Sequence, residues 1–410
     1  MASTPWVDHP VPLWLNAPDA AVVDKPIHRI RHGKADAPAN QRPAFIVEAV
    51  DFETAVELTE AWSDLVSRAL EPNVFMEPGF VLPAAQHLAR ADRPTFVAAW
   101  QTAASGAREL VAIWVLLLPA GFFKSHVAAL WCHRQAALGV PLLDAARADA
   151  LIPAIFEYLA DAFPRLRIIA FPKIVRSGPT FARLLAHALE SGLEWRLLDQ
   201  HQRAVLTRGG NVEASKERAR QRRQLEKRGL LEVRSARTPK DIRDATEAFL
   251  VLEESGWKGA RRTALLCDSS RAAFVRTMTR QLAREGKCRI DALTLDGGQI
   301  AMGIMLRSRE RMFYWKTAYD EAFAAQSPGV QLALEVSRIQ QADATCRMTD
   351  SCAIADHPMI DRIWSERLPI VDLALPLSPA GNEMLAGYAW RDAFTRRLRK
   401  FAGRRLQTGS

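Results

Sequence analysis

The sequence predicts an α/β protein in which one lobe, a sheet flanked by helices, occurs twice along the chain. The 410 residues are 49% hydrophobic and 25% charged, which leaves room for two or three globular domains and excludes fibrous and wholly disordered classes. Segments with helical spacing of apolar residues alternate with short apolar runs typical of strands. Two successive blocks share the order helix, helix, hairpin, strand, helix, strand, which indicates a tandem architecture.

The first block is expected to be a lobe over residues 44–205, preceded by an irregular arm. Residues 1–43 contain seven prolines and no sustained periodicity, so we expect no regular structure there. The lobe should begin with a helix over 52–70 that is capped by Asp51, followed by a turn-rich connector over 73–80. The remaining expected elements are a hairpin of strands 95–101 and 109–118, a helix over 148–163, a strand over 167–171 and a helix over 180–192.

The second block is expected to be a lobe over residues 206–378. Its expected helices cover 215–228, 241–252, 270–285 and 330–342, and its expected strands cover 231–235, 288–295, 300–307, 311–317 and 347–350. Asp296-Gly297 is a hairpin-turn signal between the second and third strands. Residues 379–410 form a separate basic terminal segment, with an amphipathic helix expected over 382–401.

The positive charge of the chain is concentrated in two segments. The net charge is +9, and residues 216–228 contribute +5 while residues 391–405 contribute +6, so the rest of the chain is nearly neutral. Such helices either bind a phosphate-bearing partner or present solvated faces. For 382–405 the two interpretations are packing on the protein body and contact with an anionic membrane surface.

The cysteines and the hydropathy favour a cytoplasmic protein without a metal site. The five cysteines are scattered and lack the paired spacing of a disulfide scaffold or a zinc site, and no cluster of ligating residues has metal spacing. No secretory leader opens the sequence, and the longest apolar run, 110–119, is about half of a membrane span. We therefore expect a cytoplasmic location, with peripheral contact at the inner membrane face as an option for 382–405.

The segment from Phe313 to Leu332 carries the strongest local signal of a binding site. A strand leads through a loop to Ser327-Pro328-Gly329, where a helix is expected to begin. The first amides of that helix, on Val330, Gln331 and Leu332, are expected to lack helical partners and to favour an anion such as a pyrophosphate. The alternative is an ordinary loop in which Ser327 caps the helix and Pro328 stiffens its start.

Two motifs in this region resemble a known family. The string WKxAYDxxFxxxSPGxxL spans 315–332, and LExxGWKG spans 252–259. Together they are similar to GNAT-fold acyltransferases of the CelD type, named for cellulose biosynthesis, which are distant relatives of the FemABX peptidyl transferases. The likeness covers residues 205–350 well and 45–205 less well. It implies two GNAT-like lobes, each a mixed, mostly antiparallel sheet flanked by helices, with the second lobe binding acyl-CoA.

The resemblance also implies where the acyl donor is held. In the GNAT fold the donor lies along a strand that splays from its neighbour, and by position this is 311–317. The implied cofactor contacts are Lys316, Ser327, Gly329, Val330 and Gln331, with acetyl-CoA or another acyl-CoA as donor. The phosphate loop departs from the better-known acetyltransferases, because only Pro328-Gly329 precedes the helix. The FemABX relatives use aminoacyl-tRNA, so that donor remains the alternative.

Direct acyl transfer requires a base that takes a proton from the attacking amine or hydroxyl. The candidates are Asp350, at the end of the strand after the phosphate helix, and His357 in the loop beyond it, together with Asp320 and Glu254. Asp350 either acts as the base or pairs with a basic side chain, and His357 is either catalytic or structural. Cys352 is a candidate acyl-carrying nucleophile in a different mechanism.

Three further residues form a candidate acceptor-binding group: Glu254, Trp257 and Lys258. Glycines flank Trp257 and Lys258, so the lysine can bind a carboxylate or phosphate beside an aromatic wall, or simply face solvent. Glu254 and Asp320 are also expected as ion-pair partners of Lys258 and Lys316.

Three functions remain open from the sequence. The first is transfer of an acetyl or similar group from acyl-CoA to an amine or hydroxyl of a small-molecule, polysaccharide or cell-envelope precursor. The second is aminoacyl-tRNA-dependent transfer of the FemABX kind, the one case in which nucleic acid is a partner. The third is a non-catalytic GNAT-like scaffold that binds an anionic polymer or membrane.

Overall fold

The computed structural model describes residues 45–89, 93–102, 106–119, 126–213 and 215–390. The expected proline-rich arm at 1–43 and the terminal helix beyond 390 lie outside these residues. The described chain forms two compact units, which we treat separately. The N-terminal unit consists of residues 45–78, 89–201 and 369–390, and the C-terminal unit of residues 79–88 and 202–368.

The N-terminal unit is built on a six-strand path that contains one parallel pair. The strand order is β1-β2-β3-β4-β6-β13, with β5 beside β3, and β4 and β6 are the parallel neighbours. The elements are β1 (Phe45–Val50), α1 (Phe52–Glu57), α2 (Thr59–Arg68), β2 (Thr95–Thr102), β3 (Arg108–Leu117), β4 (Val127–Leu130), β5 (Leu142–Leu143), α4 (Ala148–Ala162), β6 (Ile168–Val175), α5 (Pro179–Glu190) and β13 (Glu366–Pro376).

The core of the N-terminal unit lies between its sheet and the helices α4 and α5. Trp114 of β3 packs edge-on against Phe156 of α4 and Phe171 of β6, with ring centroids 6.2 and 5.5 Å apart. Residues 382–390 are helical, and Leu385 is buried against a smaller apolar cluster of this unit. The described part of the basic terminal segment therefore packs on the protein body.

The C-terminal unit repeats the same plan. Its strand order is β7-β12-β11-β10-β9-β8, in which residues 202–207 of β7 belong to this unit, and β11 and β12 are the parallel neighbours. The elements are α3 (Pro78–Leu88), β7 (Arg196–Thr207), α6 (Lys216–Glu226), β8 (Leu231–Ala236), α7 (Pro239–Ser255), α8 (Trp257–Ala260), α9 (Ser269–Arg284), β9 (Cys288–Leu295), β10 (Gly298–Ser308), β11 (Arg311–Tyr319), α10 (Pro328–Ala342) and β12 (Met348–Asp350). The α/β class with mixed sheets, mostly antiparallel and flanked by helices, is confirmed.

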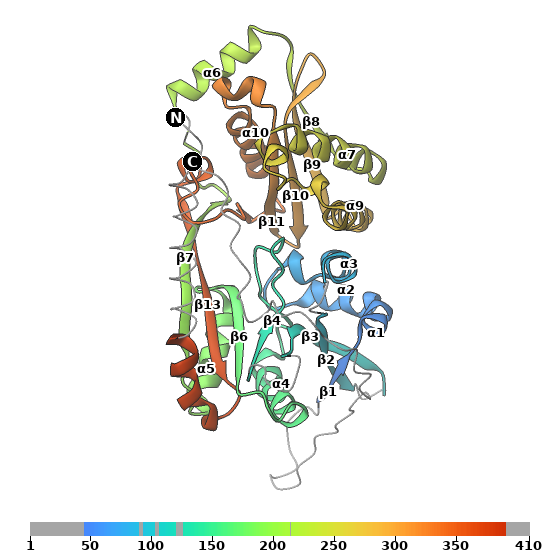
Figure 1. The fold of residues 1–410 in the computed structure, drawn as a ribbon, viewed down its shortest axis with the longest axis vertical. Helices are drawn as coiled ribbons and strands as arrows, with labels where there is room; N and C mark the ends of the chain where they lie inside the picture. Colours follow the sequence, from blue (N-terminus) through green and yellow to red (C-terminus); the bar gives the residue numbers. More distant parts are fainter. Residues whose placement is uncertain (1–44, 90–92, 103–105, 120–125, 214, 391–410) are drawn as a thin grey trace. The chain divides into compact units, whose positions relative to one another are not determined.

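Helices cover the two faces of the sheet in the C-terminal unit. Figure 1 shows α10 on one side of β9, β10 and β11, and α7 and α9 on the other. Leu332 and Val336 of α10 join Met305, Met312 and Tyr314 in one buried cluster. On the opposite face, the Phe274 ring of α9 packs edge-on against Trp315, with centroids 6.2 Å apart.

Several elements differ from the sequence-based expectation. The helix expected over 52–70 is broken at Leu58, whose ψ of 0° ends α1 before α2 begins. The connector at 73–80 leads into α3, which was not predicted because its two prolines suggest a loop; Pro78 instead occupies the first turn. The strands β1, β4, β5, β7 and β13 and the short helix α8 were also missed. The boundary between the lobes was expected at 205/206. Residues 79–88, which precede it, belong to the C-terminal unit, and residues 369–376, which follow it, belong to the N-terminal unit.

Candidate active site

The candidate site is built on β11, which carries an irregularity in its pairing with β10. Ile304 lies opposite Lys316 and Met305 lies opposite Tyr314, so Trp315 is an extra residue. A bulge of this kind re-aims the side chains that follow it. Trp315 contacts Phe274 of α9, and Lys316 Nζ lies 5.4 Å from the Trp315 ring centroid. The bulge therefore directs two consecutive side chains to the face covered by α7 and α9.

The neighbour of β11 on its other edge is much shorter than β11 itself. β12 pairs in parallel with Arg311, Met312 and Phe313, and it ends at Asp350, whereas β11 continues to Tyr319. The second half of β11 thus extends past the end of β12. A strand edge of this kind presents backbone amides that can polarise a carbonyl group.

Asp350 lies at the end of β12 in a buried cluster with two arginines. Its Oδ2 accepts hydrogen bonds from Arg203 Nη2 at 2.6 Å and Arg311 Nη2 at 2.7 Å, and its Oδ1 accepts one from the Cys352 amide at 2.9 Å. Burial by itself raises the pKa of Asp350, but the charges of Arg203 and Arg311 outweigh burial, so the pKa lies below its ordinary value. The carboxylate is ionised and held on three sides.

The loop after β12 contains two further candidates, Cys352 and His357. Burial, reinforced by the charge of Asp350, raises the pKa of the Cys352 thiol, so this side chain is a poor source of thiolate. His357 is 8% exposed, and burial lowers its pKa to about 4. Its Nδ1 faces the amides of Met359 and Ile360 at 3.3 and 3.4 Å and therefore accepts. The neutral ring then carries its proton on Nε2, where it acts as a donor.

The helix α10 begins earlier than expected, which changes the amides that its N-terminus presents. It starts at Pro328, and the carbonyl oxygen of Ser327 accepts from the amides of Val330 and Gln331 at 2.9 and 3.1 Å. The expectation that these amides are open is therefore wrong. The Ser327 side chain does not cap the helix, and its φ is 50°. Within the described residues, the Gly329 amide is the first-turn donor left without a partner.

The space around Gly329 is bounded but not crowded. A Cβ placed on Gly329 would lie 3.6 Å from the Tyr319 ring, 3.7 Å from Met359 Sδ and 3.9 Å from Thr317 Cγ2. The start of α10 therefore adjoins the end of β11 and the loop that follows β12. Gln331 is buried, and its side-chain Nε2 donates to the Arg218 carbonyl oxygen at 3.0 Å.

On the opposite face of β11, a buried glutamate faces two lysines. Lys258 Nζ lies 2.6 Å from Glu253 Oε1 and 3.4 Å from the carbonyl oxygen of Thr317. Burial raises the pKa of Glu253, but the charges of Lys258 and Lys316 outweigh burial, and the pKa is lowered. The expected pairing of Lys258 with Glu254 is wrong by one position, because Glu254 is exposed on the outer side of α7.

The remaining candidates lie where β11 ends. The Trp257 amide donates to Glu321 Oε1 at 2.7 Å, which ties α8 to the 3-10 helix Glu321–Gln326. The Trp257 ring centroid lies 5.9 Å from Lys258 Nζ and 5.4 Å from the Arg261 guanidinium. Asp320 caps the same 3-10 helix through the Ala322 amide at 2.9 Å.

The structure thus divides the predicted site residues into two groups on opposite faces of β11. Ser327, Gly329, Val330 and Gln331 lie on the face covered by α10. Lys316 and Lys258 lie beside Glu253 on the face covered by α7 and α9, and Trp257 adjoins Lys258. Sequence analysis missed Glu253, Arg203 and Arg311. For Arg203 and Arg311 the available signal was a charged residue inside an apolar strand, since such a residue needs a buried partner. For Glu253 it was the glutamate of the motif at 252–259, in helix α7.

The basic helix α6 packs beside the start of α10. Gln221 Nε2 donates to the Ala325 carbonyl oxygen at 3.4 Å, and Arg222 Nη1 lies 2.6 Å from Glu335 Oε1 of α10. On the outer side of α6, Lys216, Arg223 and Lys227 are exposed and have no partner among the described residues. Spacings of seven and four residues place these three cations on one face.

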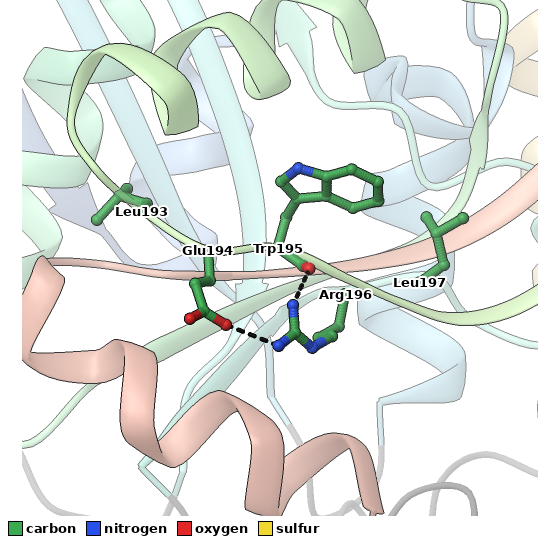
Figure 2. A pocket seen from close by; sticks show the side chains of 5 residues that line it. All are labelled: Leu193, Glu194, Trp195, Arg196 and Leu197. Carbon is green, nitrogen blue, oxygen red and sulfur yellow. Dashed lines mark hydrogen bonds and ion pairs between the residues drawn. The ribbon is translucent and has the colours of Figure 1, made fainter.

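A separate hollow lies in the N-terminal unit. It has a volume of about 580 Å³. Residues 193–197 line it, and Figure 2 shows their side chains. Glu194 Oε2 and Arg196 Nη2 in its lining form an ion pair of 2.7 Å. Across the described ranges, no group of three His, Cys, Asp or Glu residues has the geometry of a metal site. Among the same residues, no helix is long and apolar enough to span a bilayer.

Comparison with known proteins relates part of the C-terminal unit to a known domain family. Residues 214–352 match the family model of the acetyltransferase (GNAT) domain. No curated protein matches the chain. FemX shares 10% identity at a TM-score of 0.51, with 78% of this chain and 96% of FemX covered.

Two other solved structures are similar at lower TM-scores. The C-terminal domain of a protein described as a lysylphosphatidylglycerol synthetase, from Agrobacterium fabrum, has 12% identity and a TM-score of 0.48, with 83% and 96% covered. A tandem GNAT protein from the clavulanic acid biosynthesis pathway has 14% identity and a TM-score of 0.40, with 82% and 99% covered. The FemX likeness supports the fold, and residues 214–352 are similar to GNAT acetyltransferase domains.

Proposed function

We propose that the C-terminal unit is a GNAT-type acyltransferase of the CelD kind that transfers an acetyl or similar group from acyl-CoA. The observation that carries this proposal is the short β12 beside the long β11, with the start of α10 next to the end of β11. An acyl thioester lying along the second half of β11 would place its carbonyl oxygen beside strand amides and its pyrophosphate beside α10. We propose direct attack by an amine or hydroxyl of a small-molecule, polysaccharide or envelope precursor.

The residues at the start of α10 fit a pyrophosphate group. Gly329 supplies an amide without a partner, and the helix dipole adds partial positive charge at this end. The surroundings of Gly329 stand 3.6 Å or more from an added Cβ, so the backbone is approachable. In this proposal, Ser327 sets the direction of the amide through its left-handed conformation, while Val330 and Gln331 shape the first turn.

The opposite face of β11 fits the acceptor. Glu253, Lys258 and Lys316 together carry one negative and two positive charges, so the group has a net charge of +1. Trp257 provides an adjoining aromatic surface. We propose that this group binds an acceptor with a carboxylate or phosphate. Lys316 was expected on the donor side, and we now propose it for the acceptor side because the bulge at Trp315 turns it toward Glu253.

Asp350 fits a positioning role better than that of a base. A carboxylate whose pKa is held low by two guanidiniums accepts a proton poorly. Asp350 instead fixes the end of β12, and with it the point beyond which β11 has no β12 partner. His357, with Nδ1 accepting from the backbone, is a hydrogen-bond donor in this proposal, and Asp320 holds the loop that leads to α10.

The outer face of α6 favours a second candidate, an aminoacyl-tRNA donor. Lys216, Arg223 and Lys227 span about 16 Å of helix, which exceeds a single phosphate group and suits a phosphodiester backbone. The helix has no aromatic residue for base stacking, so contact would be independent of sequence.

Calorimetric titration of the full chain with acetyl-CoA, CoA and deacylated tRNA tests the two candidates. Micromolar binding of acetyl-CoA with release of free thiol toward an amine supports the first. Binding of tRNA without any response to CoA would replace it with the second. Absence of both would leave a scaffold without acyl transfer.

A further inference from the structure

Asp361 lies in the loop between β12 and β13, close to the candidate site. In this loop, Met359 lies beside Gly329, and Trp364 Nε1 donates to Ser337 Oγ of α10 at 2.8 Å. Asp361 is therefore held in a short segment that is anchored to α10 on both sides. Its position belongs to the 3-10 helix Ile360–Arg362, where its amide donates to the His357 carbonyl oxygen at 3.2 Å.

The backbone of β7 locates the Asp361 carboxyl group more closely. β7 and β12 are antiparallel, and the Ser351 amide donates to the Ala204 carbonyl oxygen at 3.2 Å. In an antiparallel ladder, a residue whose C=O bonds to one neighbouring strand also points its N–H at that strand. The Ala204 amide therefore points, like its carbonyl group, toward the path that β12 follows. That amide faces the carboxyl group of Asp361. The carboxyl group thus lies on the line of β12, just past its last residue.

This position is the gap that opens when β11 continues and β12 stops. Within the described residues, the Oδ1 atom of Asp361 is buried and has no hydrogen-bond partner. The charged and titratable groups around the carboxyl group are Arg367, Asp356 and His357. Burial raises the pKa of Asp361 above its ordinary value, and the negative charge of Asp356 adds to this rise. The positive charge of Arg367 and the amides of His357 and Ala204 oppose the rise without cancelling it. An unpartnered oxygen of this kind contrasts with Asp350, which is held by three donors.

We propose that Asp361 is the general base of the acyl transfer, a role that rests on the proposed function. The acceptor nitrogen or oxygen attacks the thioester carbonyl carbon, and the new C–N or C–O bond forms as the acceptor proton passes to Asp361. The C–S bond then breaks, the electron pair leaves with sulfur, and the proton held by Asp361 neutralises the thiolate. The products are the acylated acceptor and the free thiol, so atoms and charge balance.

The test compares Asp361→Asn with wild type and with Asp244→Asn, an exposed control on α7. Acetyl-CoA binding is followed by calorimetry, and thiol release is followed with a panel of amines and alcohols and with water alone. Asp361→Asn should bind acetyl-CoA within a few-fold of wild type and lose about 100- to 10,000-fold in kcat. Asp356→Asn should move the acid limb of kcat/KM to lower pH, because it removes a charge that raises the pKa of Asp361.

A second readout needs no acceptor. When folding raises the pKa of an aspartate, its contribution to the free energy of unfolding falls as pH rises from the pKa in the unfolded chain, near 3.8, through the pKa in the folded protein. The melting temperature of Asp361→Asn, relative to that of wild type, should therefore rise between pH 4 and pH 8. At pH 8 the variant should melt no lower than wild type. A structural carboxylate would give the opposite result.

The outcomes separate the two proposals. Failure of the wild-type chain to bind acetyl-CoA overturns the proposed function and this inference together. Transfer by Asp361→Asn at a rate near wild type overturns the role of Asp361 alone. The same conclusion follows if Asp361→Asn melts well below wild type at pH 8, whether or not an acceptor has been found.

Discussion

Replacement of Asp350 by asparagine should destabilise the protein severely. The carboxylate is fully buried and accepts three hydrogen bonds, at 2.6, 2.7 and 2.9 Å, two of them from guanidiniums. Asparagine keeps the volume but removes the negative charge, so Arg203 and Arg311 stay buried without that carboxylate. Removing one partner of a buried ion pair costs about 3–5 kcal/mol. With a slope of about 3 kcal/mol per molar urea, the unfolding midpoint should fall by about 1–2 M.

Urea unfolding followed by circular dichroism measures this effect, with Asp244→Asn as an exposed control. Since the pKa of Asp350 is lowered on folding, its contribution is present above the ordinary value of 3.8 and is lost as pH falls through the folded value. The gap between wild type and variant should therefore persist from pH 8 to about pH 4 and narrow below it. If Asp350→Asn unfolds within about 0.5 kcal/mol of wild type and yet loses acyl transfer, Asp350 is a base and the positioning role is wrong.

Two neighbouring predictions concern the other buried groups. Glu253→Gln should lower the free energy of unfolding in urea by about 2–3 kcal/mol, less than the loss of a fully buried ion pair, because the Lys258 side chain is 17% exposed. Glu254→Gln, one position along α7, should leave stability unchanged. Equal effects of the two changes would refute the pairing of Glu253 with Lys258. His357, with a pKa of about 4, should show no imidazole titration above pH 5 by NMR, and its contribution to stability should fall as pH drops below 6.5. A midpoint near 6.5 would contradict its buried, neutral state.

The class of fold could be predicted because it depends on local patterns. The repeated lobe was predicted correctly from the alternation of helical and strand-like segments and from the hairpin signal at Asp296-Gly297. The strands β7 and β13 could not be predicted in the same way, because each is completed by residues remote in sequence. β7 pairs with β12 through Val205, Leu206 and Thr207, whose partners lie more than 140 positions along the chain.

The candidate site was predicted in outline and missed in detail for similar reasons. The motif around 315–332 correctly predicted the strand, the loop and α10. Because α10 begins at Pro328, however, the amides of Val330 and Gln331 are hydrogen-bonded, and the open first-turn amide is that of Gly329. A bulge at Trp315 changes the face to which Lys316 points, and residue spacing alone carries no sign of it. Asp361 gave no signal in the sequence, since its position depends on where β12 stops.

Calorimetric titration of acetyl-CoA into wild type, Gly329→Ala and Gly329→Trp tests the central claim most directly. An alanine Cβ at this position meets its neighbours at 3.6 Å or more, so that variant should bind like wild type. The tryptophan side chain would fill the space beside Tyr319, Met359 and Thr317, and binding should fall by at least about tenfold, or about 1.4 kcal/mol. Equal affinity in all three proteins, or no binding by wild type, would contradict a donor site at the start of α10.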